Sequence, residues 1–523
     1  MLHKRGIHFY WVLGLFAVYL INGLIAIPKN SVTYDEMDHW SYGKRILMRK
    51  TDKVFQYDDA SAMPISGINA IPRAFQQLKN PGLLKTDGGF SDIMNGRYVT
   101  LIVCLLTGLF IYTWSKQLFG EKGGLLSLFL FVFCPNLNGH GILLTTDAYT
   151  AMFTVSTTYF YWKFIKRSGW KYFLAFSFSL GLAQIVKYSM VHLYVILTIV
   201  SLLVLIKRKT IFSGFKRNLG RLIVLKVIII FIINLGFLFN HPGKSLREFK
   251  MASQSFTDLQ SSFIGSVSLP VPEPYIVGLD QTTYMNELGA GHVNVSYTNY
   301  LLGRKRTGTG FWYYYLVVFI FKTPLAVLLL LIAAIFFLFV RKKKEGHPST
   351  MLFLLSFIFY FLVVLGFQNN LQLGIRHALM VYPLLYVLGG FVVQTTFYQK
   401  RAKLFSTLLV VYSLATYYFF FPNLISYSNE LILKKKNAYK VMADSNLDFG
   451  QGWYAVKKYL AANPEVRLIS NTPEEGKFVI GVNYYLDLKG EHDFPWIYDL
   501  KPVTQIGHCF LLFEVKSSDL NNQ

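Results

Sequence analysis

The sequence predicts a polytopic α-helical membrane protein with about eleven transmembrane helices, followed by a small extracytoplasmic α/β domain. Of its 523 residues, 53% are hydrophobic and 17% aromatic, while only 15% are charged. Such a composition is typical of chains that cross a bilayer many times. The net charge of +24 does not point to nucleic acid, because the positive residues cluster in short segments between apolar spans, as expected for cytoplasmic loops.

The apolar segments can be followed along the chain, since each span needs about 20 apolar residues. The first covers residues 8–27 and follows a short basic N-terminus. It is too long for the core of a signal peptide, so we expect a retained span. The last span ends near residue 422. When basic clusters such as residues 207–221 and 341–344 are placed inside, residues 28–96 and 242–310 become long external loops.

The composition changes after residue 422, where a transmembrane part (residues 1–422) gives way to a segment of mixed polarity (residues 423–523). An amphipathic pattern predicts a helix at residues 452–462, and alternating patterns predict strands at residues 478–482 and 510–515. With about eleven spans, this small α/β domain is external. The three cysteines, Cys104, Cys134 and Cys509, indicate no disulfide framework.

Polar residues collect at one level of the predicted topology, the outer ends of the spans. Ionisable groups at a membrane boundary are costly to hold and usually mark a site. Acidic and basic groups alternate there, which predicts one polar cavity at the outer surface. The residues are Asp35, Glu36, Asp38, His39, Asp147, Lys187, Tyr188, His241, Lys322, Arg376 and His377.

The acidic members have several chemical interpretations. In a helix, Asp35, Asp38 and His39 would share one side, and a carboxylate there could take a proton from an acceptor hydroxyl. Alternatively, Asp35 and Glu36 only complement a helix dipole, or the acidic residues and His39 bind a metal ion. Asp147 could equally be a helix N-cap.

The basic members also have two interpretations each. Lys322 lies in Phe321-Lys322-Thr323-Pro324 within an apolar span, where it needs a partner such as a phosphate or carboxylate, unless its ammonium group reaches the interface. Arg376 precedes a span at its outer end, where arginine suits bidentate phosphate binding or simple interfacial anchoring.

Four stretches together resemble the GT-C glycosyltransferases. The similarity is greatest to bacterial family 39-like membrane enzymes, relatives of the protein O-mannosyltransferases and the lipid A aminoarabinose transferases. The stretches follow one another in the expected order over nearly the whole chain: residues 35–39, residues 310–315 with 321–324, residues 374–377 with 382–383, and residues 444–451.

The resemblance implies an inverting transfer of a sugar from a polyprenyl-phosphate carrier to a protein, lipid or glycan acceptor outside the membrane. The site would face the exterior of a bacterial cytoplasmic membrane. No cofactor is required, because Lys and Arg can stabilise the leaving phosphate, although a divalent metal is an alternative. The implied roles are catalysis by Asp35, Glu36 and Asp147; binding of the donor phosphate by Lys322, Arg376, His377 and Lys187; and substrate contact by Asp38, His39, Tyr188 and His241.

The chain departs from this family at two positions, Phe449 and Gly452, where relatives often carry Trp and an acidic residue. The stretch at residues 444–451 therefore either seats the tail on the membrane part or takes part in substrate binding. Two other functions stay open. One is a transporter or flippase of a lipid-linked sugar, which would instead favour charges near the midplane and repeated halves. The other is an oligosaccharide or non-sugar transferase of similar architecture.

Overall fold

The computed structural model describes residues 2–54, 59–85, 89–207, 215–292, 295–340, 347–488, 490 and 492–520. Within these ranges, six helices are long and apolar enough to cross a membrane, or up to seven if one bent pair counts as a single span. The chain is therefore a multi-pass membrane protein. The six are Gly6–Lys29, Ser91–Val132, Tyr188–Lys207, Lys216–Gly236, Pro348–Gln368 and Thr396–Phe420.

The predicted count of about eleven spans is not reached by this criterion in the described residues and stays a prediction. Two predicted spans form one long helix, α5 (Phe90–Val132), with a kink at Gly120. Helices α8 (Trp170–Ala183) and α16 (Val381–Gly389) are only 14 and 9 residues long. Of the predicted cytoplasmic cluster at residues 207–221, residues 208–214 lie outside the described residues, as does the whole cluster at residues 341–344.

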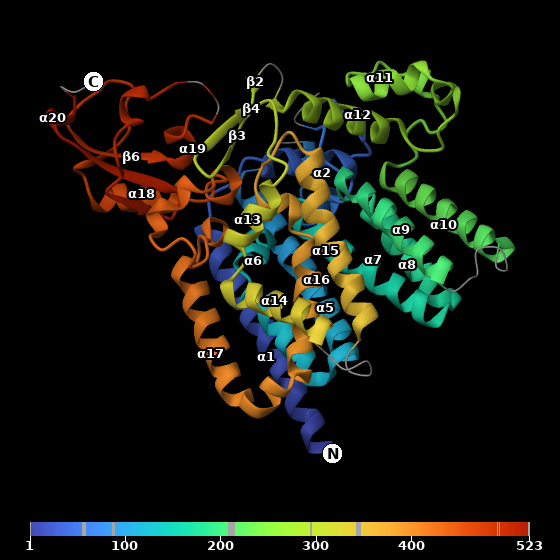
Figure 1. Ribbon diagram of the computed structural model, residues 1–523. Coiled ribbons are helices and arrows are strands. Elements are labelled where there is room, and N and C mark those ends of the chain that lie inside the picture. The colour runs from blue at the N-terminus through green and yellow to red at the C-terminus, as the bar shows by residue number, and fades with distance from the viewer. Residues whose placement is uncertain are drawn as a thin grey trace. The chain divides into compact units, whose positions relative to one another are not determined.

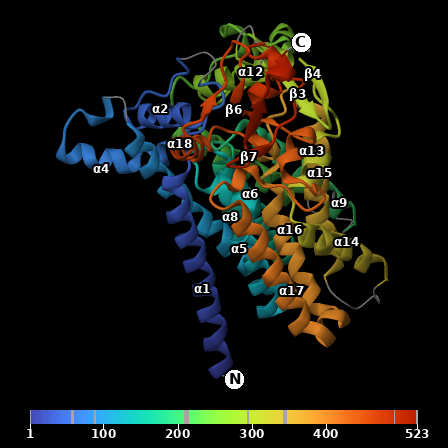
Figure 2. The same cartoon turned by 90° about the vertical axis from the view of Figure 1, so that its left-hand side faces the viewer.

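The chain divides into two compact units. The second unit comprises residues 35–110 and 144–287. In it, α7 (Asp147–Arg167) packs on α8, and α8 packs on α10 (Phe215–Gly236) (Figure 1). Helix α2 (Glu36–Leu47) packs on α3 (Ser66–Asn69), which leads to α4 (Ile71–Lys79) (Figure 2). The other helices of this unit are α9 (His192–Lys207), α11 (Gln254–Ser261) and α12 (Glu273–Leu288).

The first unit comprises residues 1–34, 111–143 and 288–523. Helix α15 (Pro348–Gln368) packs on α13 (Tyr314–Lys322) and α16, and α14 (Leu325–Val340) also packs on α16. Helices α1 (Leu2–Ala26) and α17 (Thr396–Phe420) are both labelled in Figure 2. They are joined by the Tyr418 hydroxyl, which lies 3.2 Å from Asn22 Oδ1. The short helix α6 (Pro135–Gly141) packs on a 3-10 turn, η8 (Leu424–Ser426).

The first unit also contains the strands. Two antiparallel pairs, β1–β2 (Ala290–His292, Val295–Ser296) and β3–β4 (Thr298–Leu301, Arg304–Thr307), precede a four-stranded sheet in the order β5-β6-β8-β7. Its strands are Val466–Leu468, Gly476–Gly481, Phe510–Val515 and Thr504–Ile506 in that spatial order, and only β5–β6 is parallel. The predicted strands correspond to β6 and β8, and the predicted helix to α18 (Trp453–Ala462). A domain boundary at residue 422 stays a prediction.

The break between α13 and α14 is the main irregularity among the apolar helices. The two helices are bent by 116° around Thr323 and Pro324, because proline supplies no N–H to continue the helix. The carbonyls left open at the end of α13 find distant amide partners. Asn429 Nδ2 lies 2.5 Å from Ile320 O and 2.8 Å from Thr323 O.

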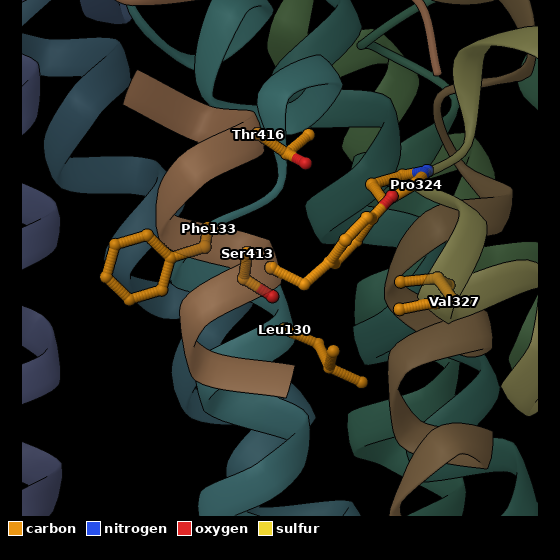
Figure 3. Close-up of a pocket in the computed structure, with 8 residues that line it drawn as sticks. Leu130, Phe133, Pro324, Val327, Ser413 and Thr416 are labelled. Carbon is orange, nitrogen blue, oxygen red and sulfur yellow. The ribbon is translucent and has the colours of Figure 1, made fainter. Parts of the chain in front are cut away.

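Two further side chains form hydrogen bonds with backbone groups at the break. Asn136 Nδ2 donates to Lys322 O at 2.6 Å, and the Tyr412 hydroxyl accepts from Leu325 N at 2.8 Å. Non-helical backbone at membrane depth is tolerated only when its polar groups are satisfied in this way. A small pocket beside the break is lined by Pro324 of the break itself and by side chains of α5, α14 and α17, among them Leu130, Val327, Ser413 and Thr416 (Figure 3).

Candidate functional site

The structure distributes the predicted site residues over both units. The acidic residues lie in the second unit together with His39, Lys187, Tyr188 and His241, while Lys322, Arg376 and His377 lie in the first. A single cavity containing all of them stays a prediction. Each unit nevertheless shows how the sequence builds its own polar cluster.

Glu36 forms a closed ion pair. Its side chain is fully buried and accepts from Arg97, with Nε 2.7 Å from Oε1 and Nη2 2.6 Å from Oε2. Leu144 N also donates to Oε1, at 2.8 Å. A buried carboxylate needs such partners. Glu36 therefore fixes the start of α2 to α5 and to the loop that precedes α7.

Arg97 was missed by the sequence analysis. The signal was available, because an arginine near the start of an apolar helix must find a partner. The bidentate geometry makes Glu36 a structural anchor for its neighbour Asp35. Direct involvement of Glu36 in catalysis stays a prediction.

Asp35 occupies the residue before α2, with φ −84° and ψ −12°, and its side chain makes no capping hydrogen bond. It is half-buried, as is Asp38, whereas His39 is buried. His39 Nδ1 lies 3.4 Å from Ser66 Oγ and so joins α2 to α3. Both interpretations of Asp35, as a partner of the helix dipole and as a catalytic base, therefore stay predictions.

Asp147 and Lys187 form a second ion pair in this unit. Lys187 Nζ lies 2.7 Å from Asp147 Oδ1, and the Asp147 side chain is 1% exposed. The N-cap of α7 is Thr146, so Asp147 is the first helical residue. A carboxylate there is stabilised both by the helix dipole and by the ammonium group. The charges of the two residues thus neutralise each other. The predicted roles, catalysis for Asp147 and phosphate binding for Lys187, stay predictions.

Tyr188 and His241 have different environments. Tyr188 is buried against α12, with its ring centroid 5.5 Å from that of Tyr275. His241 is 74% exposed, and its Nδ1 lies 3.7 Å from Glu273 Oε2. His241 is thus a surface group, and Tyr188 a packed one. Their predicted contact with substrate stays untested.

Lys322 is buried in the first unit and is 1% exposed. Its Nζ donates to Ile425 O at 2.6 Å and to Asn446 O at 2.8 Å. The ammonium group therefore does not extend to the interface but ties the end of α13 to the turns η8 and η10 (Asp444–Asn446). A cation at a helix C-terminus is also favoured by the dipole.

Arg376 and His377 lie in the turn η6 (Ile375–Ala378). Arg376 Nε donates to Leu373 O at 3.1 Å, and its Cζ lies 4.4 Å from the centroid of the Phe449 ring. His377 Nδ1 lies 3.4 Å from the Tyr315 hydroxyl oxygen. Arg376 as a whole residue is 5% exposed. Its guanidinium group contacts both a main-chain carbonyl and an aromatic ring.

Asp448 is a buried carboxylate that the sequence analysis did not single out. Burial raises the pKa of Asp448 to about 6, and the nearby Asp444 charge adds to this shift, while the hydrogen bond from Gly450 N opposes it. The residue follows the last spanning helix and lies beneath β6, against Gly481. Within the described ranges, no three His, Cys, Asp or Glu side chains gather closely enough to hold a metal ion.

A comparison with protein families gives an independent match. The family model described as dolichyl-phosphate-mannose-protein mannosyltransferase matches residues 89–234. This segment contains Asp147, Lys187 and Tyr188 but none of the four stretches that carry the resemblance in the sequence. The predicted similarity to GT-C glycosyltransferases of this type is thereby confirmed on a different part of the chain. No curated protein matches by sequence.

Two solved structures are similar in overall chain path. ArnT from Cupriavidus metallidurans, bound to undecaprenyl phosphate, has a TM-score of 0.49 and 11% identity, covering 97% of this chain and 98% of that one. The oligosaccharyltransferase of Archaeoglobus fulgidus has a TM-score of 0.47 and 13% identity, covering 76% of this chain and 52% of that one. The present chain thus spans about half of the second protein. Similarity at these scores does not bear on substrate.

The buried Glu36–Arg97 pair leads to a stability prediction. Replacing either partner with alanine leaves an unpaired buried charge, so we expect the free energy of unfolding to fall by about 3–5 kcal/mol. Unfolding of the purified protein in detergent measures the loss. The exposed pair Lys116–Glu121, at 3.1 Å, is the control, because Lys116→Ala should cost less than about 1 kcal/mol. Equal unfolding curves for Arg97→Ala and the wild type would contradict the claim that the Glu36–Arg97 pair stabilises the fold.

Asp448 leads to a prediction of pH dependence. Its pKa of about 6 in the folded protein exceeds the ordinary value of about 3.9. The stabilisation from its proton is therefore complete below about pH 4 and is lost as the pH rises through about 6. Asp448→Asn keeps an acceptor for Gly450 N but cannot ionise. We expect this variant to gain about 3 kcal/mol relative to the wild type between pH 4 and pH 7. The measurement is the free energy of unfolding of both proteins at several pH values in this range. If the difference between variant and wild type did not change with pH, the raised pKa of Asp448 would be wrong.

Proposed function

We propose that this protein is an inverting glycosyltransferase that moves a sugar from a polyprenyl-phosphate carrier to a hydroxyl group of a protein, lipid or glycan acceptor. The observation that carries the proposal is the match of residues 89–234 to the dolichyl-phosphate-mannose-protein mannosyltransferase family, in a chain with at least six helices able to cross a membrane among its described residues. ArnT, a protein of similar chain path, is bound to undecaprenyl phosphate, which accords with a lipid-linked donor.

The acceptor side of the reaction is assigned to Asp35. Its carboxylate takes the proton of the acceptor hydroxyl, the oxygen attacks the anomeric carbon, and the bond from that carbon to the phosphate oxygen breaks. The hydrogen bonds of Glu36 to Arg97 and Leu144 hold the start of α2 while this happens. A catalytic group gains most from such fixed supports.

The donor side is assigned to Arg376. Its guanidinium matches the oxygen geometry of a phosphate and stabilises the charge that grows on the leaving polyprenyl phosphate. Lys322, whose ammonium group binds two backbone carbonyls, supports the neighbouring turns. Because Arg376 supplies a positive charge for the phosphate, the proposed reaction needs no metal ion, and activity in the presence of a chelator checks this point.

The topology proposed with this function has about eleven spans. In it, the loops at residues 28–96 and 242–310 and the tail at residues 423–523 lie outside the cytoplasmic membrane of a bacterium. The basic clusters between apolar helices support this orientation through the positive-inside rule. The tail is proposed as a small α/β domain built on the β5–β8 sheet.

The reaction is tested in cells that lack the protein. Mass analysis of their glycans and glycolipids should show the loss of one sugar modification, which the wild-type chain restores. We expect Asp35→Asn to fold, to bind the carrier and to restore nothing, because an amide cannot accept the proton. Asp258→Asn, at an exposed carboxylate of α11, is the control and should restore fully. Restoration by Asp35→Asn would exclude it as the base, and an accumulated lipid-linked sugar inside the cell would favour a transporter.

The orientation is tested by cysteine labelling. The native Cys104, Cys134 and Cys509 are buried, so single cysteines introduced at exposed positions give a low background. We expect a membrane-impermeant maleimide to label Asn80→Cys and Thr472→Cys from outside intact cells. Lys400→Cys, in a basic cluster, should react only after permeabilisation. Protection of the first two positions would invert the topology.

A further inference from the structure

The turn that carries Arg376 is built directly on the segment of residues 444–451. Ser445 Oγ donates to Leu373 O at 2.6 Å. Gly374 adopts φ +81°, and a Cβ there would come within 3.1 Å of Ser445 and Asn446 atoms, so only glycine allows this close approach. Two segments about 70 residues apart in sequence therefore meet without space between them.

Asn446 links this turn to the rest of the first unit. It is fully buried, its Oδ1 accepts from Ile375 N at 2.9 Å, and its Nδ2 donates to the Tyr314 hydroxyl at 2.9 Å. Its main-chain oxygen accepts from Lys322. Every polar group of the Asn446 side chain is thus used, as a rigid buried network requires. A shift of Asn446 would move the residue next to Arg376.

Phe449 contacts the guanidinium group of Arg376 directly. The ring is 3% exposed, and the Arg376 Cζ lies 4.4 Å from its centroid. The rings of Tyr34 and His140 surround it, each with a centroid 6.4 Å away. An aromatic face attracts a guanidinium through its quadrupole. A guanidinium that lies over an aromatic ring can still donate hydrogen bonds from its N–H groups to a phosphate.

We propose that Phe449 and Asn446 are positioning residues for Arg376, which they hold in the orientation that binds the phosphate of a polyprenyl-phosphate donor. This inference rests on the proposed function. It assigns a role to the segment of residues 444–451 for which the sequence left two alternatives. The segment supports substrate binding through Arg376, and it does so because the same residues also seat the turns η6 and η10 against α13.

The test measures binding of farnesyl phosphate to the purified full-length protein, with farnesol as the ligand that lacks the phosphate. We expect Phe449→Leu to weaken farnesyl phosphate binding about tenfold and to leave farnesol binding unchanged. Phe449→Trp, which restores an aromatic face, should bind as the wild type does. Phe449→Met, whose unbranched side chain fills irregular gaps, gives the same comparison if the leucine variant does not fold.

A matched control lies in the same unit. Arg467 Cζ lies 5.3 Å from the ring centroid of Phe478, a buried residue of β6. Phe478→Leu removes an equivalent ring from beneath an arginine that has no assigned role. We expect it to lower the unfolding temperature without changing farnesyl phosphate binding.

A double variant separates positioning from general damage. If Phe449 acts through Arg376, then Phe449→Leu combined with Arg376→Ala should bind no more weakly than Arg376→Ala alone. Additive losses would overturn the proposal, as would an equal loss in Phe478→Leu or no loss in Phe449→Leu while the wild type prefers farnesyl phosphate. If the wild type binds farnesol and farnesyl phosphate equally, the assigned donor site itself fails.

Discussion

The buried ammonium group of Lys322 is the contact on which the described part of the first unit most depends. A charge at this depth must be compensated within the protein, and here two main-chain carbonyls, those of Ile425 and Asn446, do so. One side chain therefore connects a broken helix to two turns that follow the last apolar helix. Asn136 and Asn429 serve the same break by binding its open carbonyls.

In the second unit, buried charges are compensated by ion pairs. Glu36 and Arg97 are both fully buried, so each charge is tolerated only because the other is present. Asp147 and Lys187 repeat the arrangement at the start of α7. In both units, the polar groups that looked like separate functional residues are connected by short-range electrostatics, and their positions are fixed by partners far away in sequence.

The pattern of apolar runs was sufficient to predict a multi-pass helical protein, and alternation was sufficient to predict β6 and β8. The number of spans stays a prediction, because Gly120 bends α5 without ending it and because α8 and α16 are short. The residue types at the candidate site were also recognised. Their partners were not, since Arg97 lies 61 residues from Glu36 and Asn446 lies 71 residues from Ile375, and no local pattern pairs them.

The sequence by itself determined the class of protein, the resemblance to GT-C glycosyltransferases and the candidate charges, because hydropathy and residue type are local properties. Only the tertiary structure decided what each charge contacts. It placed Lys322 on backbone carbonyls, Glu36 on Arg97 and Arg376 on the ring of Phe449. The physical reason is that burying a charge is favourable only with a partner within a few ångströms, and such proximity is created by folding.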